Sequence, residues 1–251
     1  MKITAIAGER RPTLHFLREI RSASPVFLGT DIDMSAVLHH RDTVHKYSYV
    51  TYVLHAAARV LAEHPEANAA IRGAGRPRIA HHTAVNGKFT MDRTVNGRRV
   101  VLSAVLPDLE RTGLAGIQRQ IDHYRDGDPE LMPEFAGTRL LRRLPWPLGG
   151  LLFRLGVRPL ARRGTVLGTF AVTSLGHRPV DDFYSVGGTT VTLGVGRVAE
   201  RPVVRDARVE AAPVMRLSLT FDHRVIDGAE AADVLAGLKD ALENFTTGEE
   251  E

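Results

Sequence analysis

One histidine of this sequence stands among residues that suit it for acid–base chemistry. His223 lies between Asp222 and Arg224, and Asp227 follows four residues later. Neighbouring carboxylates can fix the orientation of an imidazole ring, and a ring held in this way takes up and releases protons near neutral pH. We therefore regard His223 as the candidate general base of a catalytic site.

Other spacings that suggest cofactor chemistry are incomplete. The adjacent pairs His39–His40 and His81–His82 have no carboxylate at ligand spacing, and neighbouring side chains on a helix or strand diverge. Residues 194–196 read Gly-Val-Gly, but the third glycine and the distant acidic residue of a dinucleotide site are missing. The sequence therefore predicts neither a metal site nor a dinucleotide site.

A strand and a helix must position His223. Residues 217–221 alternate between apolar and polar side chains, and leucines at helical spacing over residues 235–242 mark one face of a closing helix. The polar cluster therefore belongs to a strand-to-helix turn. Asp227, with Glu230 three residues later, also fits a helix-capping pattern, so a structural and a functional role are both open for it.

The rest of the chain mixes helical and strand patterns, which predicts an α/β or α+β fold. Apolar spacing predicts helices over residues 50–65 and 114–124. Alternating or β-branched runs predict strands at 99–105, 165–173, 189–195 and 215–221. No repeat and no linker divides the 251 residues, so we expect one domain over 1–251, with frayed ends at 1–9 and 246–251.

Composition narrows the function further. The chain has no Cys, which excludes disulfides, thiolate metal sites and a cysteine nucleophile. Of its 33 basic residues 29 are arginines, but they are scattered and aromatic residues make up only 6%, which disfavours nucleic-acid binding. The amino terminus lacks a secretory apolar segment, and arginines and prolines interrupt residues 140–160, so we expect a cytoplasmic protein without a membrane span.

The segment Asp222–Ala229 resembles the catalytic signature of the acyltransferase (E2) core of 2-oxoacid dehydrogenase complexes, a core that shares its fold with chloramphenicol acetyltransferase. Three more segments agree in order: residues 168–176, with a hydroxyl residue before a Leu-Gly turn; residues 64–69, which read His-Pro-Glu-Ala-Asn-Ala; and residues 30–34. The resemblance spans roughly residues 10–244. It implies a two-layer α/β sandwich with a mixed sheet, assembled as a trimer with active sites between subunits.

The resemblance also assigns roles to residues. His223 would take the proton from an acceptor hydroxyl or thiol that attacks an acyl thioester. Thr173, where the family more often has Ser, would donate a hydrogen bond to the oxyanion, with Ser174 as a weaker candidate. Asp227 would brace the catalytic loop by pairing with an early arginine, for which we choose Arg11 over Arg10. Arg224 is a further supporting residue of the loop.

The chain departs from the family in two ways. We expect no lipoyl domain or subunit-binding domain in it. The function that we favour from the sequence is therefore that of a stand-alone acyltransferase. It would move an acetyl or short acyl group from acyl-coenzyme A to a small-molecule hydroxyl, for example in secondary metabolism. Two alternatives stay open: transfer to or from a lipoyl group on a separate protein of a dehydrogenase complex, and a non-catalytic trimeric assembly core.

The second departure is the segment 126–163, which is longer and more basic than the matching connection of the family. It contains the only tryptophan, Trp146. One interpretation is that it covers a sheet edge or extends the trimer contact; another is that it forms a lid or binds an apolar acceptor. Its arginines are candidates for the phosphates of coenzyme A, although the sequence does not place them there: Arg142, Arg143, Arg162 and Arg163.

Overall fold

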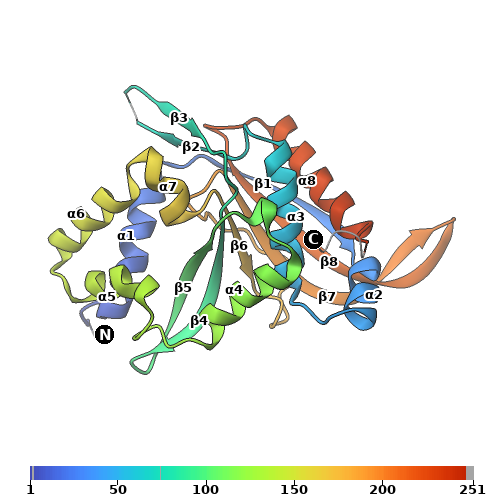
Figure 1. Cartoon of the computed structure of the whole chain (residues 1–251), viewed down its shortest axis with the longest axis horizontal. Coiled ribbons are helices and arrows are strands. Elements are labelled where there is room, and N and C mark those ends of the chain that lie inside the picture. Colours follow the sequence, from blue (N-terminus) through green and yellow to red (C-terminus); the bar gives the residue numbers. More distant parts are fainter. Residues whose placement is uncertain (2, 74, 247–251) are drawn as a thin grey trace.

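The core of the molecule is a six-stranded mixed sheet with the order β1-β8-β7-β6-β4-β5 (Figure 1). The computed structural model describes residues 1, 3–73 and 75–246. Strand β6 pairs in parallel with β4 and β7, and the other pairs are antiparallel. The strands are β1 (Pro25–Asp33), β4 (Gly87–Val95), β5 (Arg98–Leu106), β6 (Phe170–Ser174), β7 (Val191–Arg205) and β8 (Arg208–Asp222), with a separate hairpin of β2 (Ala69–Arg72) and β3 (Arg78–His81).

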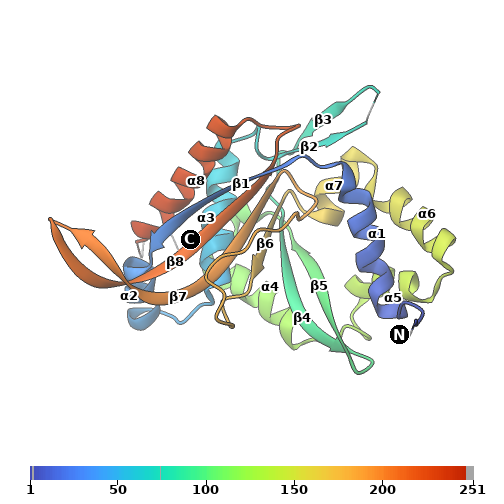
Figure 2. The same cartoon turned by 180° about the vertical axis from the view of Figure 1, so that it is seen from behind.

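Helices cover one face of this sheet and bury its apolar side chains (Figures 1 and 2). Helix α3 (Tyr49–Glu63) is buried along most of its length and packs beside α8 (Gly228–Glu243) and α4 (Leu114–Asp126), while α2 (Ser35–Thr43) contacts α8. Alternate residues of the central strands, among them Phe170, Val172 and Leu193, point into the same core. This arrangement confirms the predicted two-layer α/β sandwich.

The opposite face of the sheet is polar and is covered by an extended segment, residues 175–190. The amide of Gly187 donates to Thr192 Oγ1 at 3.0 Å, and the hydroxyl of Ser218 donates to the carbonyl of Phe183. Lys88 lies on this face too, in register with Ala171 of β6. Polar residues on this face are therefore buried beneath a loop instead of facing solvent.

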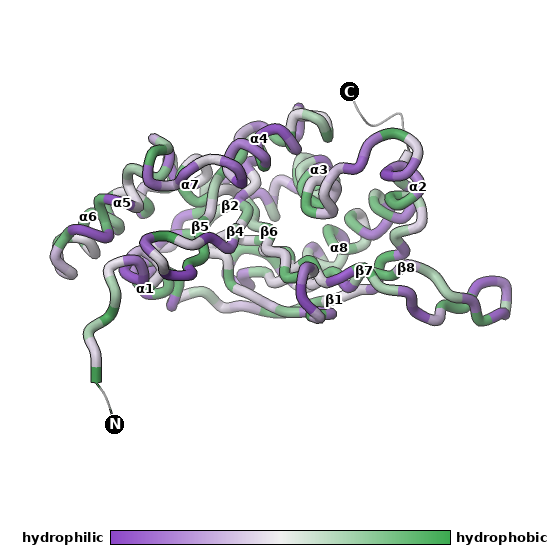
Figure 3. The backbone as a smooth tube through the Cα atoms, turned by 90° about the horizontal axis from the view of Figure 1, so that it is seen from below, coloured by the Kyte–Doolittle hydropathy of each residue, from purple (hydrophilic) through white to green (hydrophobic). Residues whose placement is uncertain are grey.

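A group of four helices stands at the end of the molecule beside the edge strand β5. It comprises α1 (Arg11–Glu19), α5 (Ala136–Arg143), α6 (Trp146–Val157) and α7 (Leu160–Leu167). Figure 3 shows this group at one end and the tip of the β7–β8 hairpin at the other. The segment 126–163 thus folds as helices beside a sheet edge, and the ring of Trp146 stacks on His15 of α1 with centroids 4.2 Å apart.

Most of the predicted elements are confirmed, and one is wrong in its first half. Residues 165–167, predicted as strand, end helix α7, and β6 begins only at Phe170. The β-branched residues here favour a strand, but packing favours a helix. Leu167 is buried, and Gly164 lies close to His82. At the chain ends, Gly8–Arg10 forms a 3₁₀ turn, while residues 247–251 of the tail lie outside the described part.

Two glycines of β7 let the covering segment run close to the sheet. A Cβ on Gly196 would collide with the carbonyl of Asp181, and one on Gly194 would collide with that of Phe183.

We expect Gly196→Ala to lower the free energy of unfolding by about 1–3 kcal/mol. Gly137→Ala in α5, where a Cβ meets nothing within 4 Å, should raise it by about 0.5–1 kcal/mol. Urea unfolding followed by circular dichroism measures both, and equal midpoints for Gly196→Ala and the wild type would contradict the close approach.

Candidate active site

His223 lies in the turn that joins β8 to α8. Its backbone amide donates to the carbonyl of Ser24 at 2.9 Å, which ties the turn to the residue just before β1. Its Nδ1 stands 3.5 Å from Oδ1 of Asp227, a distance at the outer limit of a hydrogen bond. The side chain is 47% exposed. With Nδ1 turned toward Asp227, Nε2 is the ring nitrogen that can meet a substrate.

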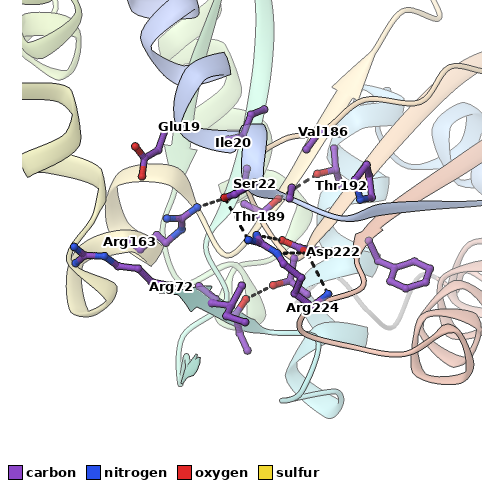
Figure 4. Close-up of a pocket in the computed structure, with 18 of the residues that line it drawn as sticks. Glu19, Ile20, Ser22, Arg72, Arg163, Val186, Thr189, Thr192, Asp222 and Arg224 are labelled. Carbon is purple, nitrogen blue, oxygen red and sulfur yellow. Dashed lines mark hydrogen bonds and ion pairs between the residues drawn. The ribbon is translucent and has the colours of Figure 1, made fainter. Parts of the chain in front are cut away.

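The turn is braced by Asp222 and Arg224 (Figure 4). The Arg224 guanidinium forms a two-pronged ion pair with the Asp222 carboxylate, whose Oδ1 also accepts from the amides of Ser24 and Arg224 at 3.3 and 3.2 Å. Burial alone would raise the pKa of Asp222, but these hydrogen bonds and the guanidinium charge prevail and lower it. The residues on either side of His223 therefore form one rigid clamp.

From the sequence we expected Asp222 to help orient the His223 ring and Arg224 to support the loop, but we did not pair these two residues with each other. The sequence did contain a signal for this ion pair, because an acid and a base on either side of a histidine can pair across it. What the sequence did not show is that the carboxylate is buried, which strengthens the pair.

Within one chain Arg11 does not pair with Asp227. Nη1 of Arg11 donates to the carbonyls of Arg142 and Leu144 at 3.2 and 2.9 Å, because Arg11 begins α1 inside the helical group. Asp227 occupies the N-cap position of α8, as its sequence pattern predicts, but its side chain makes no capping hydrogen bond. Its carboxyl group is largely exposed and faces His223.

Glu230 does not complete the predicted capping box either. Its carboxylate pairs with Nδ1 of His64 at 2.9 Å, which links the end of α3 to the first turn of α8. His64 opens the His-Pro-Glu segment singled out in the sequence. One segment that carries the family resemblance therefore contacts the residue that directly follows another, beside the turn that holds His223.

Thr173 of β6 lies on the wall of a hollow of about 900 Å³. Lys88 and Thr90 of β4 share this wall, and apolar side chains of α5, α6 and α7 form the wall opposite. Ser174, one residue on, is not among the residues that line the hollow, and its hydroxyl accepts from the amide of Gly176 at 3.3 Å. Thr173 is thus the hydroxyl of this pair that faces the hollow.

Thr173 and His223 lie far apart within one chain. Thr173 is in register with Gly194, and Gly194 with Ser218, five residues before His223. The separation is about 17 Å along the strands and about 10 Å across two strand spacings. A single chain therefore does not bring the two groups to one reacting atom.

A second hollow, of about 520 Å³, adjoins the clamp and is strongly basic (Figure 4). Six arginines and two carboxylates line it: Arg18, Arg21, Arg72, Arg158, Arg163 and Arg224, with Glu19 and Asp222. Glu19 is engaged by Arg158 at 3.1 Å, and burial lowers the pKa of Arg163. Of the four arginines that the sequence offered for phosphates, Arg163 lines this hollow, whereas Arg142 pairs with Glu130 and lines the larger one.

Lys88 is the buried cation that the sequence analysis missed. Its side chain is only 4% exposed, its ammonium donates to the carbonyl of Gly187, and it lies 4.9 Å from the centre of the Phe16 ring. Burial, helped by the charge of Arg163, lowers the pKa of Lys88 to about 7. The only signal in the sequence was its rarity, since lysine occurs at four positions.

Comparison with known proteins supports the family resemblance. Residues 160–248 match the family model of the 2-oxoacid dehydrogenases acyltransferase catalytic domain. The dihydrolipoyllysine-residue succinyltransferase component of the 2-oxoglutarate dehydrogenase complex of Cupriavidus necator is 27% identical over 203 residues, which cover 79% of this chain and 40% of that protein. The acetyltransferase component of the pyruvate dehydrogenase complex of Bacillus subtilis is 56% identical over 50 residues, 20% of this chain and 11% of that one.

Solved structures show the same fold. A probable dihydrolipoamide acetyltransferase from Listeria monocytogenes superposes with a TM-score of 0.73 at 18% identity, covering 98% of this chain and 96% of that one. A chloramphenicol acetyltransferase gives 0.55 at 16% identity, covering 95% and 99%. These matches confirm the predicted resemblance and fold, while the chain spans only about 40% of the length of the curated succinyltransferases it matches.

The buried ammonium of Lys88 gives a testable pH dependence. The pKa is about 7 in the folded chain and about 10.5 in the unfolded chain, so between these values the unfolded chain binds the proton that the folded chain has released. Lys88 therefore makes stability rise as the pH increases from about 7 to about 10.5, and it costs stability below pH 7. We expect Lys88→Met to remove this rise and to unfold at higher urea concentration at pH 7.

Urea unfolding between pH 6 and pH 10 measures this effect, with Lys46→Met, at an exposed position, as the control. The difference between each variant and the wild type isolates one lysine from the other titrating groups. If the stability of Lys88→Met and of the wild type changed with pH in the same way, burial would not lower the pKa of Lys88.

Proposed function

We propose that this chain is an acyltransferase domain that moves an acyl group between coenzyme A and a dihydrolipoyl thiol carried by another protein. The observation that supports this best is the clamped turn that presents His223, in a chain with the sequence match and the fold of the E2 acyltransferase core. The relatives at 27% and 56% identity are named as dihydrolipoyllysine-residue acyltransferases. This favours the lipoyl alternative over the small-molecule hydroxyl of our first reading, for which the comparisons give no support.

The residues suit a direct transfer between two thiols. Nε2 of His223 takes the proton from the dihydrolipoyl S–H, and the sulfur attacks the carbonyl carbon of the acyl thioester. The hydroxyl of Thr173 donates to the oxygen that becomes negative in the tetrahedral intermediate. When the intermediate collapses, the carbon–sulfur bond to coenzyme A breaks, and its sulfur takes the proton back from the imidazolium.

One solved relative supports these roles. The structure of dihydrolipoamide acetyltransferase from Azotobacter vinelandii is described in terms of a serine, a histidine and an asparagine in the catalytic mechanism, the asparagine four residues after the histidine. In this chain Asp227 follows His223 at the same spacing, and we assign the part of the hydroxyl residue to Thr173. We assign Asp227 to the orientation of the His223 ring, which it faces.

The basic hollow suits the phosphates of coenzyme A. Arginine binds phosphate with two parallel hydrogen bonds and stays charged, and the hollow carries six arginines against two carboxylates. The carboxylates engage Arg158 and Arg224. The other four arginines of the hollow are then the candidates for phosphate: Arg18, Arg21, Arg72 and Arg163. The larger, mostly apolar hollow beside Thr173 suits the acyl group and the hydrocarbon part of the lipoyl arm.

We further propose that the catalytic site is completed between two copies of the chain. The separation of Thr173 from His223 within one chain supports this, because one reacting carbonyl must meet both groups. Solved relatives are described as the cubic core of a pyruvate dehydrogenase complex and the catalytic core of another 2-oxoacid dehydrogenase complex. A cyclic trimer, as the resemblance implies, would place each His223 opposite the Thr173 of a neighbour.

The activity itself is tested by following acyl transfer from acetyl- and succinyl-coenzyme A to dihydrolipoamide. We expect His223→Ala to lower kcat by about 10²- to 10⁴-fold, because the general base is lost. We expect Thr173→Ala to lower it by about 10²- to 10³-fold and Thr173→Ser to retain most of it, because serine keeps the donor. Transfer to alcohols but not to dihydrolipoamide would support a small-molecule hydroxyl as the acceptor. No transfer by a well-folded assembly would favour a non-catalytic core.

The shared site has its own test. When His223→Ala and Thr173→Ala chains are expressed together, random mixing in a cyclic assembly leaves about a quarter of the sites with both intact groups. We expect the mixture to recover activity toward that level, while each variant alone stays inactive. An inactive mixture of assemblies shown to contain both chains would place the complete site within one chain.

The ion pair between Asp222 and Arg224 needs its own test, because it holds the turn that positions His223. We expect Asp222→Asn to lower kcat about tenfold, because the ion pair that fixes the turn is lost, and Arg224→Gln to do the same. The two changes together should cost no more than either one, as expected for two partners of one interaction. Asp233→Asn on the exposed side of α8 is the control, and additive losses in the double variant would show that the two residues act independently.

A further inference from the structure

Helix α6 has an apolar face that no described part of the chain covers. Its inner side packs into the helical group, with Gly149 and Val157 buried and Trp146 stacked on His15. Four leucines on its outer side are 40–63% exposed. Their spacing of three and four residues puts them on one side of the helix, which we call the leucine face: Leu148, Leu151, Leu152 and Leu155.

This face belongs to a concentration of exposed apolar side chains. Among the residues that the structure describes, seven of the nineteen large hydrophobic side chains that are strongly exposed fall in α5–α7. Figure 3 shows these helices at the outer end of the molecule. Single exposed hydrophobic residues are ordinary, but a contiguous group marks a surface that contacts something other than water.

The segment that carries the leucine face is basic. Residues 135–180 contain eight arginines and no aspartate or glutamate. Arg143 of α5, Arg154 of α6 and Arg162 of α7 are exposed. Two other arginines of this segment, Arg142 and Arg158, pair with Glu130 and Glu19. A surface that complements this face must therefore be apolar within and negatively charged at its rim.

We propose that the leucine face and its three exposed arginines dock on an anionic phospholipid bilayer. Leucines would enter the boundary between headgroups and acyl chains, and the guanidinium groups would pair with lipid phosphates. Trp146, at the start of α6 and 38% exposed, has the amphipathic ring that favours this boundary. Contact with a second copy through a two-fold axis would instead bring the same arginines together, which like charges oppose.

Docking of this kind is peripheral, and the leucine face adjoins the large hollow. No helix in the described part of the chain is long and apolar enough to cross a membrane. Leu140, Leu152 and Val166 are exposed and also line the hollow that contains Thr173. An apolar surface thus continues from the leucine face to the rim of that hollow.

Trp146 is the only tryptophan of the chain, so its fluorescence reports on this face alone. Vesicles of phosphatidylglycerol and of phosphatidylcholine are mixed with the whole protein and sedimented. We expect the protein to sediment with the anionic vesicles, more weakly as salt rises, and brominated acyl chains to quench the Trp146 emission. Leu151→Glu with Leu155→Glu should weaken binding at least about tenfold. Val209→Glu, an exposed position in the distant β7–β8 hairpin, should bind as the wild type does.

A second variant keeps the test decisive if the glutamates disturb α6. Arg143→Gln with Arg154→Gln and Arg162→Gln changes only exposed side chains and should weaken binding to the anionic vesicles while circular dichroism stays unchanged. The proposal is overturned if wild-type protein does not bind these vesicles, or if the leucine and arginine variants bind as well as it does. It is also overturned if light scattering shows that the leucine variant lowers the oligomer mass, since the face is then a contact between copies. Each outcome is read without an acyl-transfer assay, so it stands apart from the proposed activity.

Discussion

The turn that presents His223 depends on one buried carboxylate. Asp222 ends β8 with only 9% of its surface exposed, and an ionised group in that position is stable only when hydrogen bonds replace water. Ser24, the backbone of Arg224 and the Arg224 guanidinium supply them. Because these partners come from the residue before β1 and from the turn itself, satisfying one charge fixes the path of the chain on both sides of His223.

The two hollows differ in polarity. The hollow beside the clamp carries arginines that match phosphates, and the hollow beside Thr173 is largely apolar. The arginine-rich helices α5–α7 contribute to both, since Arg163 lines the first, and Leu152 and Phe153 line the second. Segment 126–163 thus contributes arginines to the basic hollow and apolar side chains to the larger one.

Local patterns in the sequence predicted most of the fold. The helix over residues 50–65, the closing helix and the strand before His223 are confirmed because each has an uninterrupted apolar spacing. Residues 165–167 became helix because burial of Leu167 outweighs a local β preference. The partner of Arg11 could not be predicted, since its carbonyl acceptors lie more than 130 residues away. Lys88 was missed because its burial is created by the segment that crosses over it.

The position of α5–α7 along the chain bears on how this fold tolerates change. They lie in the connection between β5 and β6, so the parallel pairing of β4 with β6 closes a loop that contains them. The entropy lost in closing a flexible loop grows only with the logarithm of its length, about 0.6 kcal/mol for each doubling. Helices can therefore be added or exchanged in this connection at little cost to the sheet, which leaves the binding surfaces they build free to diverge while the catalytic turn stays the same.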